Sequence, residues 1–144
     1  ILLVEDNLQD EKLIFRALGK ANISNAIDVA RDGQQALDYL FQCGEFSHLA
    51  GKAPPAVVML DINLPRVNGL DVLRLLRENA RTRLVPVVIL TSSDDEGDRM
   101  RGYDHGANSF VRKPIDLADF MHKVAQLGVY WTATNIPPFQ GGKI

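Results

Sequence analysis

Short apolar runs separated by polar, turn-rich segments recur along this chain. Four of them predict strands near residues 1–4, 57–60, 85–90 and 110–112, and a shorter strand is expected at 26–30. The run 85–90 is almost wholly apolar, which is typical of a parallel strand covered on both faces. Several of the intervening segments carry apolar residues at helical spacing. Strands that alternate with helices in this way favour a parallel sheet wrapped on both faces.

Five helices are predicted between and after these strands. The first covers residues 8–20, with Asn7 as its N-cap and Asp10 three residues later. The remaining predictions are a second helix at 33–42, a third after Asn68-Gly69, a fourth starting at the acids 94–96, and a fifth after Asp116.

The apolar positions of the later helices predict how they pack. Leu70, Leu73 and Leu76 are expected to face the sheet. The stripe on the last helix is also expected to be core, and it consists of Leu117, Phe120, Met121, Val124 and Leu127.

These elements predict a doubly wound, five-stranded parallel sheet of order 2-1-3-4-5 with five helices, the flavodoxin-like arrangement. The domain is expected to span residues 1–131. A long loop is expected at 44–55, and the tail 132–144 is expected to be an extended arm or disordered. In this strand order the first and third strands are neighbours, and ligands bind at the carboxyl ends of the strands.

Polar side chains end four of the apolar runs. They are Glu5 and Asp6 after the first strand, Asp61 after the third, Thr91 after the fourth and Lys113 after the fifth. Because the carboxyl ends of parallel strands share one edge, these side chains are expected to form a single site.

The charges at this edge predict a bound cation. Carboxylates about 5 Å apart repel by roughly 3 kcal/mol per pair at an effective dielectric near 20, so without a cation one of them should take up a proton. Mg²⁺ removes the conflict, with Asp6, Asp61 and a backbone carbonyl near Asn63 as ligands, and Mn²⁺ can substitute. Lys113 and the Thr91 hydroxyl add donors, so the set can hold a phosphoryl group.

A family resemblance rests on these residues and on several landmarks around them. The landmarks are Glu5-Asp6, Asp61 with Asn63-Leu64-Pro65, Asn68-Gly69, Thr91-Ser92, Gly106-Ala107 and Lys113-Pro114. From Ile1 to about Trp131 the chain resembles the receiver domain of two-component response regulators. The resemblance implies a signalling domain and not an enzyme with an external substrate.

The resemblance also implies roles for individual residues. Asp61 would take a phosphoryl group from a histidine kinase or phosphotransfer protein, Asp6 would bind Mg²⁺ directly, and Glu5 would act through a metal-bound water. Thr91 and Lys113 would sense the phosphorylated state. The following further roles are implied: Phe110 as the switch aromatic, Asn63 and Ser93 as residues that tune the phosphate lifetime, and a cis peptide bond before Pro114.

A closer likeness is to the stand-alone regulators that partner phytochrome-type sensor kinases. It rests on segments 4–7, 63–65 and 107–110, on the long loop after the second helix, and on Tyr130-Trp131 before Pro137-Pro138. Arg66 departs from the pattern, because many relatives carry glycine there.

The output surface is expected to be the face formed by the fourth helix, fifth strand and fifth helix. No recognisable effector domain follows, so the chain is expected to act through protein contacts, including a homodimer formed by this face and the tail. Tyr130 and Trp131 are the interface candidates, since two adjacent aromatics on a helix point in different directions.

Three alternatives stay open at this point. A phosphatase that forms an aspartyl-phosphate usually has a second acid close after the nucleophile, but Asn63 stands there. A flavin-binding protein needs a phosphate-cradling loop after the first strand, where this chain is acidic. The third alternative is a receiver-like docking or dimerisation module that works without phosphate.

Composition excludes several other classes. The chain has 144 residues with 46% hydrophobic content, enough for one core. Its 16 basic and 18 acidic residues are interspersed, which argues against direct nucleic-acid binding. No apolar run approaches the roughly 20 residues of a membrane span, and the single Cys43 suits a reducing compartment. We therefore expect a cytoplasmic protein.

Overall fold

The computed structural model describes residues 1–139 and contains the predicted five-stranded parallel sheet. The strands lie in the order β2-β1-β3-β4-β5. Their bounds are β1 (Leu2–Val4), β2 (Asp28–Ala30), β3 (Val58–Leu60), β4 (Val87–Thr91) and β5 (Ser109–Arg112). Val4 is paired with Ala30 on one side and with Leu60 on the other. The first three strands therefore end side by side, and the residues that follow them share one edge.

Five α-helices connect and follow these strands. They are α1 (Leu8–Lys20), α2 (Gly33–Phe41), α3 (Gly69–Glu78), α4 (Glu96–Asp104) and α5 (Leu117–Val129). Each one begins behind an Asn or Asp whose side chain accepts a hydrogen bond from a backbone N–H of the first turn. For α1 this residue is Asn7, as predicted, and its donor is the N–H of Asp10 at 3.0 Å.

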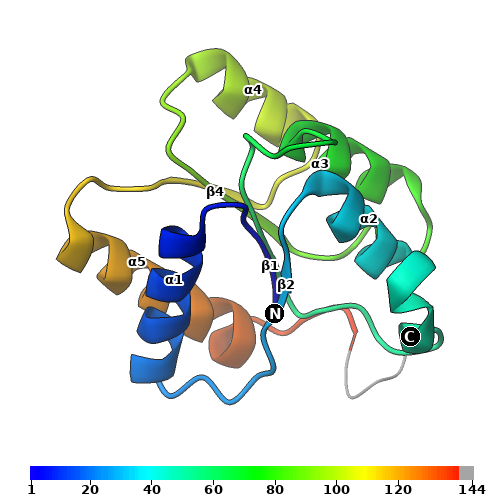
Figure 1. Ribbon diagram of the computed structural model, residues 1–144, viewed down its shortest axis with the longest axis horizontal. Helices are drawn as coiled ribbons and strands as arrows, with labels where there is room; N and C mark the ends of the chain where they lie inside the picture. The colour runs from blue at the N-terminus through cyan, green and yellow to red at the C-terminus, as the bar shows by residue number, and fades with distance from the viewer. Residues whose placement is uncertain (140–144) are drawn as a thin grey trace.

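The helices form two layers around the sheet, with α1 and α5 on one face and α2, α3 and α4 on the other (Figure 1). Successive strand residues point to opposite faces. Leu2 and Val4 therefore join the core on the α2 and α3 side, whereas Leu3 joins the core on the α1 and α5 side. The predicted stripe of α3 is buried, since Leu73 and Leu76 have no exposed surface.

Two predicted features differ from the structure, one in α5 and one in the loop that follows α2. Leu117 was expected in the core but is 52% exposed, because it opens the first turn of α5 at the edge of the sheet. The predicted loop 44–55 begins with a 3₁₀ helix, η1 (Gly44–Leu49), whose Phe46 packs edge-on against Tyr39.

The predicted tail also needs correction over the residues that the structure describes. A π-helical turn, η2 (Tyr130–Thr134), continues α5 beyond the expected boundary at residue 131. Farther on, Phe139 packs against the core on the α2 and α3 side. Residues 132–134 therefore belong to this helical turn and Phe139 contacts the core, whereas the role of the tail as an arm stays a prediction and the rest of the tail lies outside the described residues. Within residues 1–139, none of the helices has the length and apolar character needed to cross a membrane.

Candidate functional site

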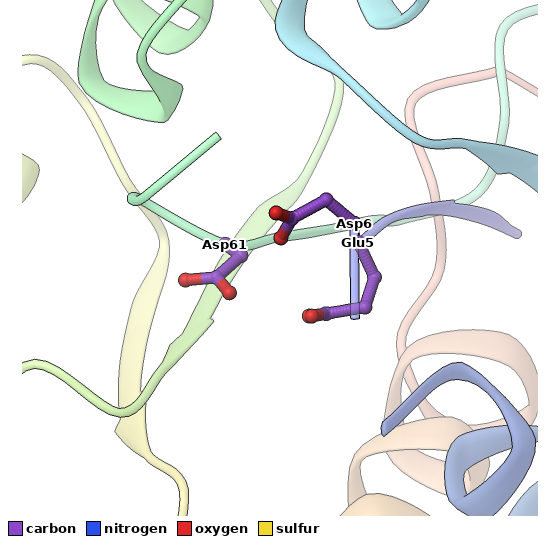
Figure 2. Close-up of side chains that lie close together, drawn as sticks. All are labelled: Glu5, Asp6 and Asp61. Carbon is purple, nitrogen blue, oxygen red and sulfur yellow. The ribbon is translucent and has the colours of Figure 1, made fainter. Parts of the chain in front are cut away.

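Three carboxylates meet where β1 and β3 end, as the strand order predicted. The Asp61 N–H donates to the Val4 carbonyl oxygen at 3.1 Å, which ties the two strand ends together. Glu5, Asp6 and Asp61 each offer an oxygen, and these three oxygens lie within 4.8 Å of one another (Figure 2). The expectation that Asp6 and Asp61 face each other is confirmed.

The carboxylates differ in burial, and this difference indicates where a cation would bind. Glu5 is 2% exposed and Asp61 is 7% exposed, whereas Asp6 is open to solvent. Asp61 Oδ1 is buried without a hydrogen-bond partner, although a buried polar atom normally has one. A divalent ion would satisfy this oxygen, and the solvent-facing side would leave room for water ligands. The residues present therefore fit Mg²⁺ or Mn²⁺, which prefer carboxylate oxygens.

Lys113 directly follows β5 and binds the carboxylates. Its ammonium group donates to Glu5 Oε2 at 2.8 Å, to Asp10 Oδ2 at 2.9 Å and to Asp61 Oδ2 at 3.2 Å. Its side chain is only 8% exposed. Asp10 was not predicted as a site residue. Its place in the first turn of the helix that starts at this edge was the available signal, but that turn was interpreted only as a cap.

Burial and charge shift the ionisation of the site. Burial raises the pKa of Glu5 to about 7, although the hydrogen bond from Lys113 opposes this shift. For Lys113, burial lowers the pKa, but the charge of Asp61 and the bonds to Glu5 and Asp10 outweigh it, so the pKa is raised. Lys113 therefore stays charged, and Glu5 holds a proton part of the time near neutral pH. The raised pKa of Glu5 has the expected direction, but burial is its main cause and the charge of Asp61 contributes less.

Thr91 ends β4 as a fully buried residue. Its hydroxyl oxygen accepts from the Ser93 N–H at 3.3 Å, and its carbonyl accepts from the Lys113 N–H at 2.7 Å. The Ser93 hydroxyl donates to Asp98 Oδ2 at 2.7 Å. Thr91 is thus joined to both β5 and the start of α4.

Phe110 on β5 is half-buried and packs against α4. Its ring centre lies 6.4 Å from that of Tyr103. A Cβ on Gly102, the only residue that α4 buries, would come within 3.2 Å of the Phe110 ring. A side chain at residue 102 would therefore crowd both Ile89, at 2.8 Å, and the Phe110 ring.

The loop from β3 to α3 closes tightly on the site. Gly69 donates to the Ile62 carbonyl at 2.8 Å, and a Cβ at Gly69 would overlap the carbonyl oxygen of Asp61. Asn63 is exposed in this loop. The proposal that its carbonyl binds the metal stays a prediction.

The peptide bond between Lys113 and Pro114 corrects one implied feature. All peptide bonds of the described residues are trans, so the cis bond implied by the family resemblance is absent. The trans form is the usual lower-energy isomer before proline, and Lys113 reaches its three partners with it.

The aromatic pair that follows α5 points two ways, as expected. Tyr130 is 49% exposed, whereas Trp131 packs against the core on the α1 and α5 side. The two rings meet edge to face at 5.0 Å. Tyr130 is thus the member that faces solvent.

Comparisons with known proteins agree with this architecture. The sequence model of the response regulator receiver domain matches residues 1–125. The chain is 38% identical over 138 residues to the probable methanogenesis regulatory protein FilR2 of Methanothrix harundinacea, covering 96% of this chain and 86% of FilR2. It is 33% identical over 138 residues to the response regulator Rcp1 of Synechocystis sp., covering 96% of this chain and 92% of Rcp1.

Solved structures give the same result. The crystal structure of the Mn²⁺-bound form of Rcp1 has a TM-score of 0.89 and 32% identity, covering 96% of this chain and 97% of that one. The crystal structure of the phosphorylated cyanobacterial phytochrome response regulator RcpA also has a TM-score of 0.89 and 32% identity, covering 96% of both chains. The similarity therefore includes the whole sheet and the edge that carries the carboxylates.

Proposed function

Because the chain belongs to the response regulator receiver domain family, we propose that Asp61 accepts a phosphoryl group from a phosphohistidine. The donor would be a histidine kinase or a phosphotransfer protein. The observation that carries the assignment is the setting of Asp61, a buried strand-end carboxylate with an unpartnered oxygen beside two acids and a lysine.

The transfer is an in-line displacement at phosphorus. A carboxylate oxygen of Asp61 forms the new P–O bond, the P–N bond to the histidine breaks, and the imidazole leaves with a proton. Lys113, 3.2 Å from Asp61, neutralises charge beside the reacting group. Mg²⁺ or Mn²⁺, bound directly by Asp6 and Asp61 with Glu5 acting through a water, would supply further positive charge for the phosphoryl oxygens.

Phosphorylation would be read by Thr91 and Lys113. The phosphoryl group adds negative charge and strong acceptor oxygens, so the Thr91 hydroxyl would exchange its contact with Ser93 for one with the phosphoryl group. Phe110 would respond next, because it packs between β5 and α4, the helix that Ser93 holds at its start. Asn63 and Ser93 flank the site and would tune the phosphate lifetime.

One such contact is too weak to switch the protein alone. A charge-assisted hydrogen bond contributes about 1.5–3 kcal/mol, whereas reversing a 1:99 population to 99:1 takes about 5.5 kcal/mol. Binding of a partner or of a second copy would supply the difference.

A second copy would dock on the face of α4, β5 and α5. A groove of about 700 Å³ runs along the edge strand β5 and α5, lined by residues that include Phe110, Leu127, Tyr130 and Trp131. Arg112 and Lys123 also line the groove, and this combination of apolar and charged side chains suits a specific protein contact. Sedimentation with and without a phosphate analogue would test the homodimer, and a monomer under both conditions at high concentration would refute it.

The kinase would contact the other side of the site. A hollow of about 250 Å³ lies beside Lys113 and Asp10, and Ile115 and Leu117 line it. Ile115 is fully exposed and Leu117 is about half exposed. Exposed apolar side chains beside a reactive group favour a protein donor. The similarity to RcpA, a cyanobacterial phytochrome response regulator, supports a phytochrome-type sensor kinase as that donor.

Intact-mass spectrometry tests the proposed function. The native chain and Asp61→Asn would be incubated with acetyl phosphate or phosphoramidate in the presence and absence of Mg²⁺. We expect one added phosphoryl group that requires both Asp61 and the cation. A native chain that gains no adduct from either donor would favour the phosphate-independent docking module, and incubation with FMN would test the flavin alternative.

A further inference from the structure

Arg66, in the loop between Asp61 and α3, occupies a backbone position that favours glycine. Its φ is +70°, in the left-handed region, where a Cβ is unfavourable. Asn22 and Gln42 also have positive φ, but each directly follows or caps the end of a helix, where this conformation is common. Arg66 is not at a helix end.

Neighbouring contacts hold this conformation in place. The Gly33 N–H donates to the Pro65 carbonyl at 3.2 Å, and a Cβ at Gly33 would overlap the carbonyl of Val67. The end of the loop is fixed by the bond from Gly69 to the Ile62 carbonyl. These contacts hold the backbone on both sides of residue 66, so an arginine at this position bears the strain of the left-handed conformation.

The contacts of the Arg66 side chain do not offset this strain. Its guanidinium is 3.5 Å from Asp32 Oδ2, and the side chain is 62% exposed. The other oxygen of Asp32 already caps α2 by accepting from Gln35 at 2.7 Å. A long, exposed ion pair contributes little to stability, so fold stability does not explain an arginine here.

The charge of the site gives Arg66 a use. A phosphodonor is anionic, and it must approach the carboxylates of Glu5, Asp6, Asp10 and Asp61. Lys113, the lysine among them, is already shared by three of these carboxylates. An exposed cation on the rim would offset the remaining repulsion.

We propose that Arg66 recruits the anionic phosphodonor to Asp61, an inference that rests on the proposed function. Residue 66 lies in the loop 62–68, whose ends meet beside Asp61, and it follows Asp61 by five residues, so its Cα is within about 18 Å of Asp61. The flexible arginine side chain shortens that distance for its charge. A strained cation held at the rim of an active site is the kind of outlier that indicates function.

The expected effect follows from Coulomb's law. A unit charge about 10 Å from a dianion in water changes the encounter rate about fourfold. Screening removes most of this at high salt, because the Debye length is about 3 Å at 1 M. For a donor with one negative charge instead of two, the logarithm of the change in encounter rate should be about half as large.

The test is the second-order rate constant for phosphorylation with Mg²⁺, followed by intact mass. The variants are Arg66→Gln, Arg66→Gly and Arg66→Lys, with Arg74→Gln as a matched loss of an exposed arginine on α3. With acetyl phosphate at low salt, we expect the glutamine and glycine variants to be about fourfold slower. The lysine and Arg74 variants should stay within about twofold of the native rate.

Two further readouts separate recruitment from structure. The deficit should shrink with phosphoramidate, which carries less charge at neutral pH, and vanish at 1 M salt. Only Arg66→Gly relieves backbone strain, so a purely structural role would make its rate differ from that of Arg66→Gln. The proposal is overturned if Arg66→Gln matches the native rate at low salt. If the native chain is not phosphorylated at all, the proposed function falls and this inference with it.

Discussion

Replacing Lys113 with methionine should destabilise the metal-free protein and make its stability depend strongly on Mg²⁺. Methionine keeps much of the length of the side chain but removes the charge that three carboxylates share. The Lys113 side chain is 8% exposed, and the contacts of its ammonium group with Glu5, Asp10 and Asp61 are 2.8, 2.9 and 3.2 Å long. After the change, the nearly buried carboxylates of Glu5 and Asp61 lose this cation. They still lie close to the carboxylates of Asp6 and Asp10.

The magnitude can be bounded from this geometry. Removing one partner of a buried ion pair costs about 3–5 kcal/mol, because the remaining charge is left uncompensated. Protonation limits the cost here, since Glu5 already has a pKa of about 7 and would take up a proton more readily without Lys113. We therefore expect the lower end, about 3 kcal/mol at pH 8, and less at pH 6.

Urea unfolding followed by circular dichroism would measure this loss. With an m-value of about 2 kcal/mol/M, the midpoint should fall by about 1.5 M at pH 8 without Mg²⁺. Saturating Mg²⁺ should restore more stability to Lys113→Met than to the native chain, because a divalent cation can replace the missing charge. Lys123→Met is the matched control. Lys123 is 45% exposed, and its ion pair with Asp119 is long, at 3.6 Å. This substitution should therefore change the free energy of unfolding by less than about 0.5 kcal/mol. Equal midpoints for Lys113→Met and the native chain without Mg²⁺ would refute this account of the site.

Three further predictions concern the same fold and site. Asp61→Asn should raise the free energy of unfolding of the metal-free protein by about 1–2 kcal/mol, since it removes one of several close negative charges. The variant should also lose most of the stabilisation by Mg²⁺, and an unchanged Mg²⁺ response in thermal unfolding would contradict the metal assignment. The pKa of Glu5 is raised from 4.5 to about 7, so its contribution to metal-free stability should decline as pH rises between these values. Mg²⁺ affinity should rise over the same window with release of protons, and calorimetry in buffers of different ionisation enthalpy that detects no proton release would refute this. Arg77→Met should cost about 2–3 kcal/mol, because its guanidinium donates to the carbonyls of Gly106, Arg83 and Val85; a urea midpoint within error of the native value would show that these loops need no such clamp.

The fold was largely predictable because local signals agreed with one another. The strands are short apolar runs, and the first helix starts behind Asn7, which could be identified as a cap from the sequence. Strand order then brought Asp6 and Asp61 together without further information. The docking of Phe139 was missed because it depends on contacts between distant segments. The π-helical turn was also not predicted.

The site was predicted less completely than the sheet. Side-chain identity placed Lys113 at the correct edge, but it did not reveal that Asp10 is one of its partners. That contact depends on how α1 is oriented against β5. The bond before Pro114 was expected to be cis from resemblance alone and is trans. Arg66 was noted as a departure, but its strained backbone became evident only from the loop geometry.

The bonds made by Lys113 also have a consequence for synthesis of the chain. Lys113 lies 108 residues after Glu5 and 52 residues after Asp61. At a translation rate of about 5–20 residues per second, the acids emerge several seconds before the lysine that neutralises them. During that interval the carboxylates of Glu5 and Asp61 repel each other without Lys113 to neutralise them, so early pairing of β1 with β3 should be sensitive to divalent cations. A fragment that ends before β5 would preserve that intermediate, and its folding should require Mg²⁺ where the complete chain does not.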